Sequence, residues 1–415
     1  VTLRIPIREE SKNWRWRGKE PQMNQAKTNK RRQRNKAKKK NKGEANQTRP
    51  VGWLEFKLPR NSTVKYSMDM LARTTGYRNS LTVDLPHSEL WSSVNHDLLW
   101  RSGAQRICCD LSNPLGWNTL RNWHFNISSE NLKLYLLRDH IFLLIDLVND
   151  WASGPPSDYH VFTPYNYHVH LKLDDVKVLF NVNDGNIIDN ATSLEDNTYL
   201  IVSSPSLTTE TTIPLDKFRP DKNSIPFDVR CDTLNLVLHA PQWNTEAAFL
   251  SSNQLAHAES LAITGSYNYN DTTSPANTDT LILKVHGQSP NAFVYGFLIR
   301  YVILLKDNYF GDCVHFRTLD EYQNQLQLKA QNKHADQLAP PNKKSNDLDV
   351  ILSIKIDDPQ IMVPTNLYSA TRCIKAELAS IAVDLRFTNY YMDMELDLAP
   401  LSISLGGSAD ALDSP

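Results

Sequence analysis

Apolar and polar side chains alternate with a strict period of two in short runs from residue 51 onward. The runs begin with LEFKL at 54–58 and VKYSM at 64–68 and extend to MDMELDL at 392–398. Successive side chains of a β-strand point to opposite faces of a sheet, so this pattern indicates antiparallel strands with one apolar and one solvated face. Helical spacing is confined to 139–151, 297–305 and the polar segment 319–331. The sequence therefore predicts a mainly β fold with a few short helices.

Charge is distributed unevenly along the chain. Residues 1–50 contain 17 Lys and Arg against 4 Asp and Glu, and since the whole chain is at −1, the remainder is at −14. Segment 19–49 has hardly any apolar residue and cannot bury enough surface to order itself, so we expect a disordered basic insert. Three roles are open for this insert. It is a solvated loop, a segment that contacts anionic lipid headgroups, or a segment that binds nucleic acid or directs nuclear import. The acidic remainder argues against a nucleic-acid partner.

The sequence contains no GxSxG, HExxH or phosphate-loop pattern. His168 and His170 share one strand face, but no third metal ligand is apparent. The paired acids Asp174 and Asp175 are expected in a turn rather than as a converging catalytic pair. We therefore expect no enzymatic activity, no catalytic residue, no metal and no cofactor.

Cysteine usage and hydropathy bear on the compartment. The number of cysteines is odd and none forms a CxxC pair, which favours a reducing environment. The most apolar stretch, 293–305, is too short to span a membrane and contains Arg300. Any membrane anchor is expected to lie outside this piece of chain.

One segment recurs at an offset of 183 residues: LKLDDVKVLF at 171–180 resembles IKIDDPQIMV at 354–363. Both read as a strand, an acidic turn and a second strand. A second pair, 227–238 and 392–405, supports a repeated module. Stacked modules predict an elongated, curved antiparallel sheet whose concave apolar face stays exposed as a binding site. The alternative is a two-layered sandwich that buries the same face on itself.

Several unusual strings carry a resemblance to a known family. The chain resembles the Tweek branch of the bridge-like lipid-transfer proteins over nearly its whole length outside the basic insert. The strings are IPIR (5–8), WRW (14–16), VNHD (94–97), DLSNPL (110–115), NVNDGN (181–186), PQWNT (241–245), DNYFGD (307–312) and FTNYY (387–391).

The resemblance implies a long rod of repeating β-groove modules, anchored in the endoplasmic reticulum membrane by a helix that precedes this piece. The rod carries phospholipids to a second membrane at a contact site, with this part facing the cytosol. In fungi the route is linked to phosphatidylethanolamine supply for glycosylphosphatidylinositol (GPI) anchor synthesis. Bound phospholipid is therefore expected, with membranes at both ends of the full protein and unidentified adaptor proteins as partners. The alternative function is a structural tether or adaptor without lipid conduction.

The domain division follows from the repeat and the resemblance. We expect an edge strand and a Trp/Arg patch at 1–18, the insert at 19–49, a first module at 50–160, a second at 161–342 and the start of a third at 343–415. Apolar members of the alternating runs are the candidates for the lipid-binding groove. They are Val169, Leu171, Leu173, Val176, Val178, Phe180, Leu234, Leu236, Leu238, Ile354, Ile356, Ile361 and Val363.

Overall fold

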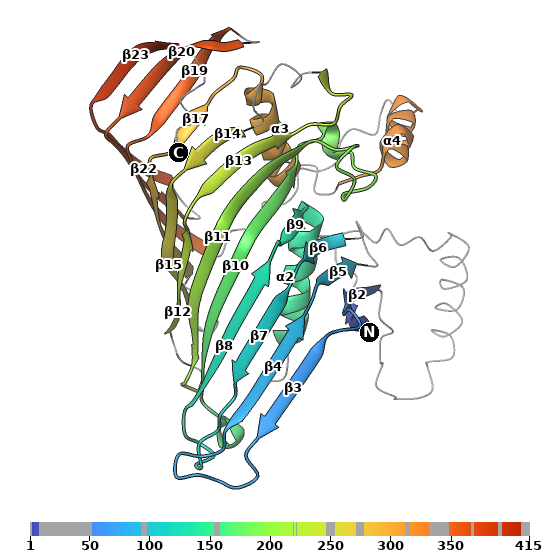
Figure 1. Cartoon of the computed structure of the whole chain (residues 1–415), viewed down its shortest axis with the longest axis vertical. Coiled ribbons are helices and arrows are strands. Elements are labelled where there is room, and N and C mark those ends of the chain that lie inside the picture. The colour runs from blue at the N-terminus through green and yellow to red at the C-terminus, as the bar shows by residue number, and fades with distance from the viewer. Residues whose placement is uncertain are drawn as a thin grey trace.

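A computed structural model describes residues 2–7, 52–92, 98–152, 158–218, 220, 222–245, 254–270, 278–311, 316–331, 348–366, 369–388 and 392–407. Every strand of these segments belongs to one hydrogen-bonded sheet (Figure 1). No second β-layer covers it in the described part of the chain, which excludes the two-layered sandwich there. The mainly β fold is confirmed.

The strands of the sheet are β1 (Thr2–Ile7), β2 (Gly52–Lys57), β3 (Thr63–Met68), β4 (Asn79–Leu85), β5 (Ser88–Ser92), β6 (Leu98–Ser102), β7 (Gln105–Asp110), β8 (Arg121–Glu130), β9 (Lys133–Leu136), β10 (Tyr165–Asn181), β11 (Tyr199–Leu215), β12 (Lys222–Cys231), β13 (Leu234–His239), β14 (Gln254–Ala258), β15 (Ser260–Asn270), β16 (Asp279–Gln288), β17 (Asn291–Phe293), β18 (Leu348–Asp357), β19 (Gln360–Asn366), β20 (Ser369–Leu378), β21 (Ser380–Phe387), β22 (Met392–Leu398) and β23 (Leu401–Gly407).

The sheet has two halves that share β10 and β11. The upper half in Figure 1 runs β1-β2-β5-β6-β9-β10-β11-β13-β14-β17-β19-β20-β23. The lower half runs β3-β4-β7-β8-β10-β11-β12-β15-β16-β18-β21-β22. Strands β3 to β11 are seen broadside, whereas β12 and β15 are nearly edge-on (Figure 1). The sheet is therefore curved rather than flat.

The predicted curved, mostly antiparallel sheet is present, with parallel pairs at two steps. β10 is parallel to β8 and β9, and β18 and β19 are parallel to β16 and β17. Parallel neighbours need a crossover connection, and the helices lie in these two connections. β10 and β18 begin 183 residues apart, at Tyr165 and Leu348. The sequence repeat thus coincides with a repeat in topology, while the module boundaries themselves remain a prediction.

A line of backbone irregularities separates the two halves of the sheet, and we call it the crease. Asn131, Asp175, Ser289 and Asp358 lie on this line, and each has a positive φ between 47° and 52°. Short polar side chains tolerate this left-handed conformation better than others. Backbone hydrogen bonds continue across the crease, for example from Asn131 N to the Asp174 carbonyl at 2.8 Å.

The predicted acidic turn at Asp174 and Asp175 was therefore wrong. β10 runs straight through both residues, and β18 and β19 do not pair with each other on either side of Asp358. The same residue types that favour turns also permit a left-handed residue inside a strand. Here they shift the alternation by one position without reversing the chain.

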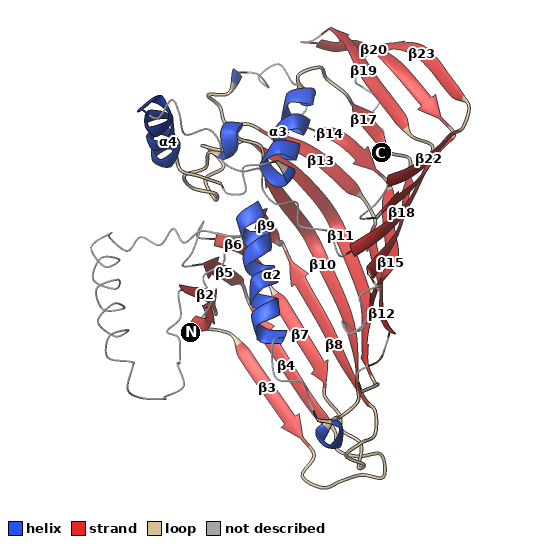
Figure 2. Ribbon diagram, turned by 180° about the vertical axis from the view of Figure 1, so that it is seen from behind, coloured by secondary structure: helices blue, strands red, loops and turns tan. Residues whose placement is uncertain are grey.

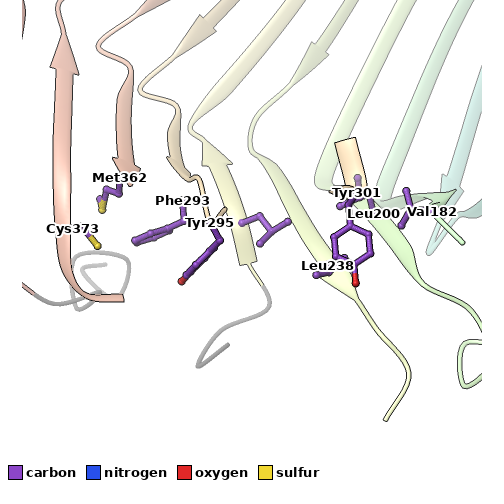
Figure 3. Close-up of a cluster of buried hydrophobic side chains, with 9 residues drawn as sticks. Val182, Leu200, Leu238, Phe293, Tyr295, Tyr301, Met362 and Cys373 are labelled. Carbon is purple, nitrogen blue, oxygen red and sulfur yellow. The ribbon is translucent and has the colours of Figure 1, made fainter. Parts of the chain in front are cut away.

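Helices α2 (Arg138–Ala152), α3 (Leu298–Phe310) and α4 (Leu319–Gln331) confirm the three stretches of helical spacing. α2 and α3 lie on the same face of the sheet (Figure 2). Leu143 of α2 packs with Leu54, Leu90 and Leu99 of the strands. Tyr301 of α3 joins a cluster with residues from the ends of neighbouring strands (Figure 3).

The Trp/Arg patch expected before residue 18 and the basic insert at 19–49 lie outside the described residues. At the start of the chain, β1 pairs with β2 alone among the described strands. None of the described helices has both the length and the apolar character needed to cross a membrane.

Asp175 provides a test of the crease. Asp175→Val should lower the free energy of unfolding by about 1–2 kcal/mol, because a β-branched residue is strained at positive φ. Asp175→Gly should be nearly neutral, and Asp174→Val, one position away at ordinary φ, should stay within about 0.5 kcal/mol. Urea unfolding followed by circular dichroism measures all three. Equal stability of the Asp175→Val and Asp174→Val variants would contradict the role given to the crease.

Candidate lipid-binding face

One face of the sheet is apolar across its whole width. Residues directly opposite one another in neighbouring strands share a face, so the pairing register traces rows across the sheet. The upper row is apolar at every position. It consists of Leu3, Phe56, Leu90, Trp100, Leu134, Val178, Val202, Leu236, Ala256, Ala292, Ile361, Ala376 and Ile403.

A row across the lower half of the sheet has the same character, broken by a single threonine. It consists of Val64, Val83, Ile107, Ile127, Leu171, Thr209, Val229, Ile263, Val285, Ile354, Val383 and Leu396. We refer to the two rows and their neighbours on the same side as the apolar face.

The opposite face is polar along one row and apolar along another: Tyr135, Leu179 and Ile201 pair across it and belong to a buried cluster. The polar row lies one residue from the upper apolar row, on the crease side, and contains no apolar side chain. Its members are Thr2, Lys57, Glu89, Arg101, Lys133, Lys177, Ser203, Asn235, His257, Asn291, Gln360, Glu377 and Ser402. Ion pairs such as Arg101–Glu89, at 2.8 Å between Nε and Oε1, lie on this face. Along this row the opposite face is therefore hydrated, in contrast to the apolar face.

The pairing register places all thirteen predicted groove residues on the apolar face. In β10 the apolar positions are odd before Asp175 and even after it, so Leu171 and Val178 face the same way. Leu236 pairs with Val202, and Ile354 pairs with Val285. Whether these side chains contact lipid remains a prediction.

Sequence reasoning missed other members of the apolar face. Trp100, Val202 and Ala292 lie in short or mixed segments where no run of strict alternation is visible. The signal that would have found them is the change between odd and even apolar positions where the chain crosses the crease. When this shift is allowed for, two short strands on either side of the crease, such as β8 and β9, form the two parts of one long strand.

Apolar side chains are most exposed where the sheet ends. At one margin Val64 is 65 % exposed and Tyr66 59 %, and at the other Leu396 is 51 % and Leu405 84 % exposed. Toward the middle of both rows most side chains are half-buried, such as Leu171 and Val229. Leu90 of the upper row is buried, and so are the predicted groove residues Leu173, Val176 and Leu238. Exposed apolar surface of this extent usually marks a binding site.

Helix α3 covers the upper end of the apolar face and is attached by polar contacts. Asn308 Nδ2 donates to the carbonyls of Asn181 at 3.2 Å and Asn183 at 3.0 Å. The Tyr309 hydroxyl accepts from the Asn181 N–H at 2.9 Å and donates to the Leu136 carbonyl at 2.5 Å. Burial raises the pKa of Tyr309, so the hydroxyl stays protonated. α3 thus closes one side of the face in a fixed position.

The polar face holds two shallow hollows, of about 420 and 400 Å³. The first is lined by His124, His168 and His170, and the rings of His124 and His168 stack at 4.6 Å. His168 and His170 share a face, as expected. No group of His, Cys, Asp and Glu suited to a metal ion occurs among the residues that the structure describes.

Burial raises the pKa of Cys109, Cys231 and Cys373, which keeps these thiols unreactive.

Removing the Tyr309 hydroxyl should loosen α3. Tyr309→Phe leaves the buried Asn181 N–H and the Leu136 carbonyl without this partner, at a cost of about 1–3 kcal/mol in the free energy of unfolding. Tyr159→Phe is the control, since Tyr159 is 65 % exposed. Chemical denaturation of both variants checks this, and a Tyr309→Phe variant as stable as Tyr159→Phe would show that the contact is unimportant.

Two comparisons agree on the relatives of this chain. Residues 25–340 match the family model described as the Csf1 N-terminal region. Protein CSF1 of Saccharomyces cerevisiae is 28 % identical over 385 residues, covering 86 % of this chain and 13 % of that protein. Protein CSF1 of Eremothecium gossypii is 28 % identical over 390 residues, covering 85 % of this chain and 14 % of that protein.

A more distant match points to the wider family. Bridge-like lipid transfer protein family member 1 of Homo sapiens is 22 % identical over 180 residues, which cover 43 % of this chain and 4 % of that protein. The chain thus spans only a small part of the length of its relatives. The family model covers well over half of the chain, and the chain belongs to the Csf1 family, matching its N-terminal region.

Proposed function

We propose that this chain is a segment of a lipid conduit in which acyl chains lie along the apolar face. The observation that carries the proposal is the pair of rows that stay apolar from one margin of the sheet to the other. No described strand covers them, and the face remains exposed at both margins. A continuous path of this kind suits a mobile cargo better than a closed pocket does.

The energetics of lipid extraction support this function. Burying a methylene is worth about 0.8 kcal/mol, so a two-chain phospholipid that leaves a bilayer for water loses on the order of 20 kcal/mol. An uninterrupted apolar surface removes most of this barrier, while the headgroup remains in solvent. The polar groups of the sheet lie on the opposite face, so we expect little headgroup selectivity and no catalytic step or cofactor.

The membership of the chain in its family supports a more specific proposal. We place the full protein at the endoplasmic reticulum membrane, with this part facing the cytosol and a second membrane at a contact site as acceptor. Phosphatidylethanolamine supply for GPI-anchor synthesis is the route we propose in fungi. Phospholipids and the two membranes are the proposed partners, together with adaptor proteins still to be identified.

A structural tether is the second candidate, and one observation favours it. Leu298, Leu304 and Leu305 of α3 pack against the sheet, and α2 fills another part of the same face. If protein side chains occupied the whole face in this way, no lipid could pass. The described helices, however, leave the margins of both rows exposed.

Native mass spectrometry of the purified chain separates the two candidates. A conduit should retain several phospholipid species, with different headgroups, because the contacts are made with acyl chains. A tether should give the mass of the bare polypeptide. Release of the lipids into organic solvent, followed by their analysis, identifies the classes.

The apolar face can be tested with a matched pair of variants. Leu171→Asp, Val178→Asp and Leu236→Asp combined should reduce co-purified phospholipid at least about tenfold, because each charge would lie against an acyl chain. The control combines Lys172→Asp, Lys177→Asp and Asn235→Asp, which change the neighbouring positions on the polar face. It should keep its lipid.

Circular dichroism of both triple variants establishes that they fold. Equal lipid content in the two folded variants would reject the apolar face as the binding surface.

A further inference from the structure

Two strand-connecting loops and a short 3₁₀ helix lie at the lower end of the sheet (Figures 1 and 2) and carry exposed apolar side chains outside the rows described above. We call this set of side chains the tip. It comprises Met70, Leu71, Leu115, Trp117, Tyr159 and Val161, which are between 59 % and 85 % exposed. They come from the β3–β4 loop, the β7–β8 loop and the short 3₁₀ helix Tyr159–Val161 that precedes β10. Three segments far apart in sequence thus expose apolar groups at one place.

The loops of the tip are held in position by backbone hydrogen bonds. Tyr77 and Asn113 exchange N–H···O bonds of 2.8 and 2.9 Å, which tie the first loop to the second. Gly76 allows this close approach, since a Cβ there would meet the Asn113 carbonyl, and its φ is +119°. The Arg121 N–H donates to the Pro164 carbonyl at 3.0 Å, which ties the second loop to the segment before β10. The exposed side chains are therefore presented on a structured support.

Aromatic packing ties in a further loop. Phe218, in the β11–β12 connection, contacts Tyr159 at 5.4 Å and Phe162 at 5.5 Å between ring centroids. Exposed charges of both signs border the tip: Arg78 and Lys217 are basic, and Asp158 and Asp216 are acidic. The tip therefore has no strong charge of one sign to select an acidic or basic partner.

The apolar face runs into the tip without a polar interruption in β10. Tyr165 and Tyr167 continue the series of odd positions that includes Leu171. Trp123 packs against Tyr165 at 4.9 Å and against Tyr167 at 5.9 Å between ring centroids. Amphipathic aromatic residues such as these are favoured at the boundary between lipid and water.

From these observations we infer that the tip inserts into the interfacial layer of a lipid bilayer. Projecting apolar and aromatic side chains with balanced charges around them suit a bilayer surface, which has no fixed shape to match. The inference deepens the proposed function by naming the surface that meets a membrane. It rests on that function only in assuming that the contact serves lipid transfer. Tyr165, Tyr167 and Trp123 would then line the passage between the bilayer and the apolar face.

Sedimentation with sucrose-loaded phosphatidylcholine vesicles tests the inference. Vesicles without anionic lipid are used so that a contact between the basic segment 19–49 and anionic headgroups cannot contribute to binding. The wild-type chain should bind, with less than about a twofold change between low and high ionic strength, because the insertion is apolar. Leu71→Ser combined with Trp117→Ser should lower the partition coefficient at least about tenfold.

A matched control is available at another tryptophan. Trp243, which follows β13 at the other end of the strands, is 67 % exposed, and its Nε1 donates to the Glu195 carbonyl at 3.2 Å. Trp243→Ser should bind vesicles like the wild type. Tip variants that bind as well as Trp243→Ser, or a wild-type chain that does not bind, would overturn the inference. The latter outcome would leave a protein partner as the occupant of the tip.

The two proposals fail in different ways. Leu71→Ser with Trp117→Ser should keep its co-purified phospholipid, since neither residue belongs to the apolar rows. Loss of vesicle binding with retained lipid supports the tip. Absence of lipid from the wild type together with vesicle binding that depends on the tip would reject the conduit and leave the tip as a membrane contact.

Discussion

The structure depends on keeping apolar side chains on one side of a very wide, broken sheet. A strand that simply continued its alternation past the crease would turn its apolar residues into water on the opposite face. The apolar positions shift by one at the left-handed residues Asn131, Asp175, Ser289 and Asp358, so that apolar side chains on both sides of each residue share a face. The small cost of the left-handed backbone is offset by the apolar area that stays together. Both halves of the sheet therefore contribute to a single apolar face.

The two parallel steps explain how such a sheet can be extended. Each group of antiparallel strands ends in a connection that crosses the apolar face and returns to start the next group in the parallel direction. α2 and α3 lie in these connections and cover only part of the face, and polar contacts of Asn308 and Tyr309 fix α3 at the strand ends. Repetition of this unit lengthens the face without closing it, which is the geometry that a conduit requires.

Much of this architecture is predictable from the amino-acid sequence, and the exceptions have physical reasons. Periodicity identified the mainly β fold, the three helices and the offset of 183 residues that separates β10 from β18. It could not show the parallel steps, because a strand's own pattern does not depend on its neighbour's direction. The sequence predicts a turn at Asp174 and Asp175 because turns and left-handed strand residues use the same side chains. The tip was missed because single apolar residues in loops have no period.

Photocrosslinking along β10 tests the central claim most directly. A photoreactive amino acid is placed at each position from 169 to 180 in turn, and crosslinking to a labelled phospholipid is measured. We predict crosslinks at the odd positions 169, 171 and 173 and then at the even positions 176, 178 and 180, with the switch at Asp175. Crosslinks without this periodicity, or confined to Lys172, Lys177 and their polar neighbours, would contradict a lipid-carrying apolar face.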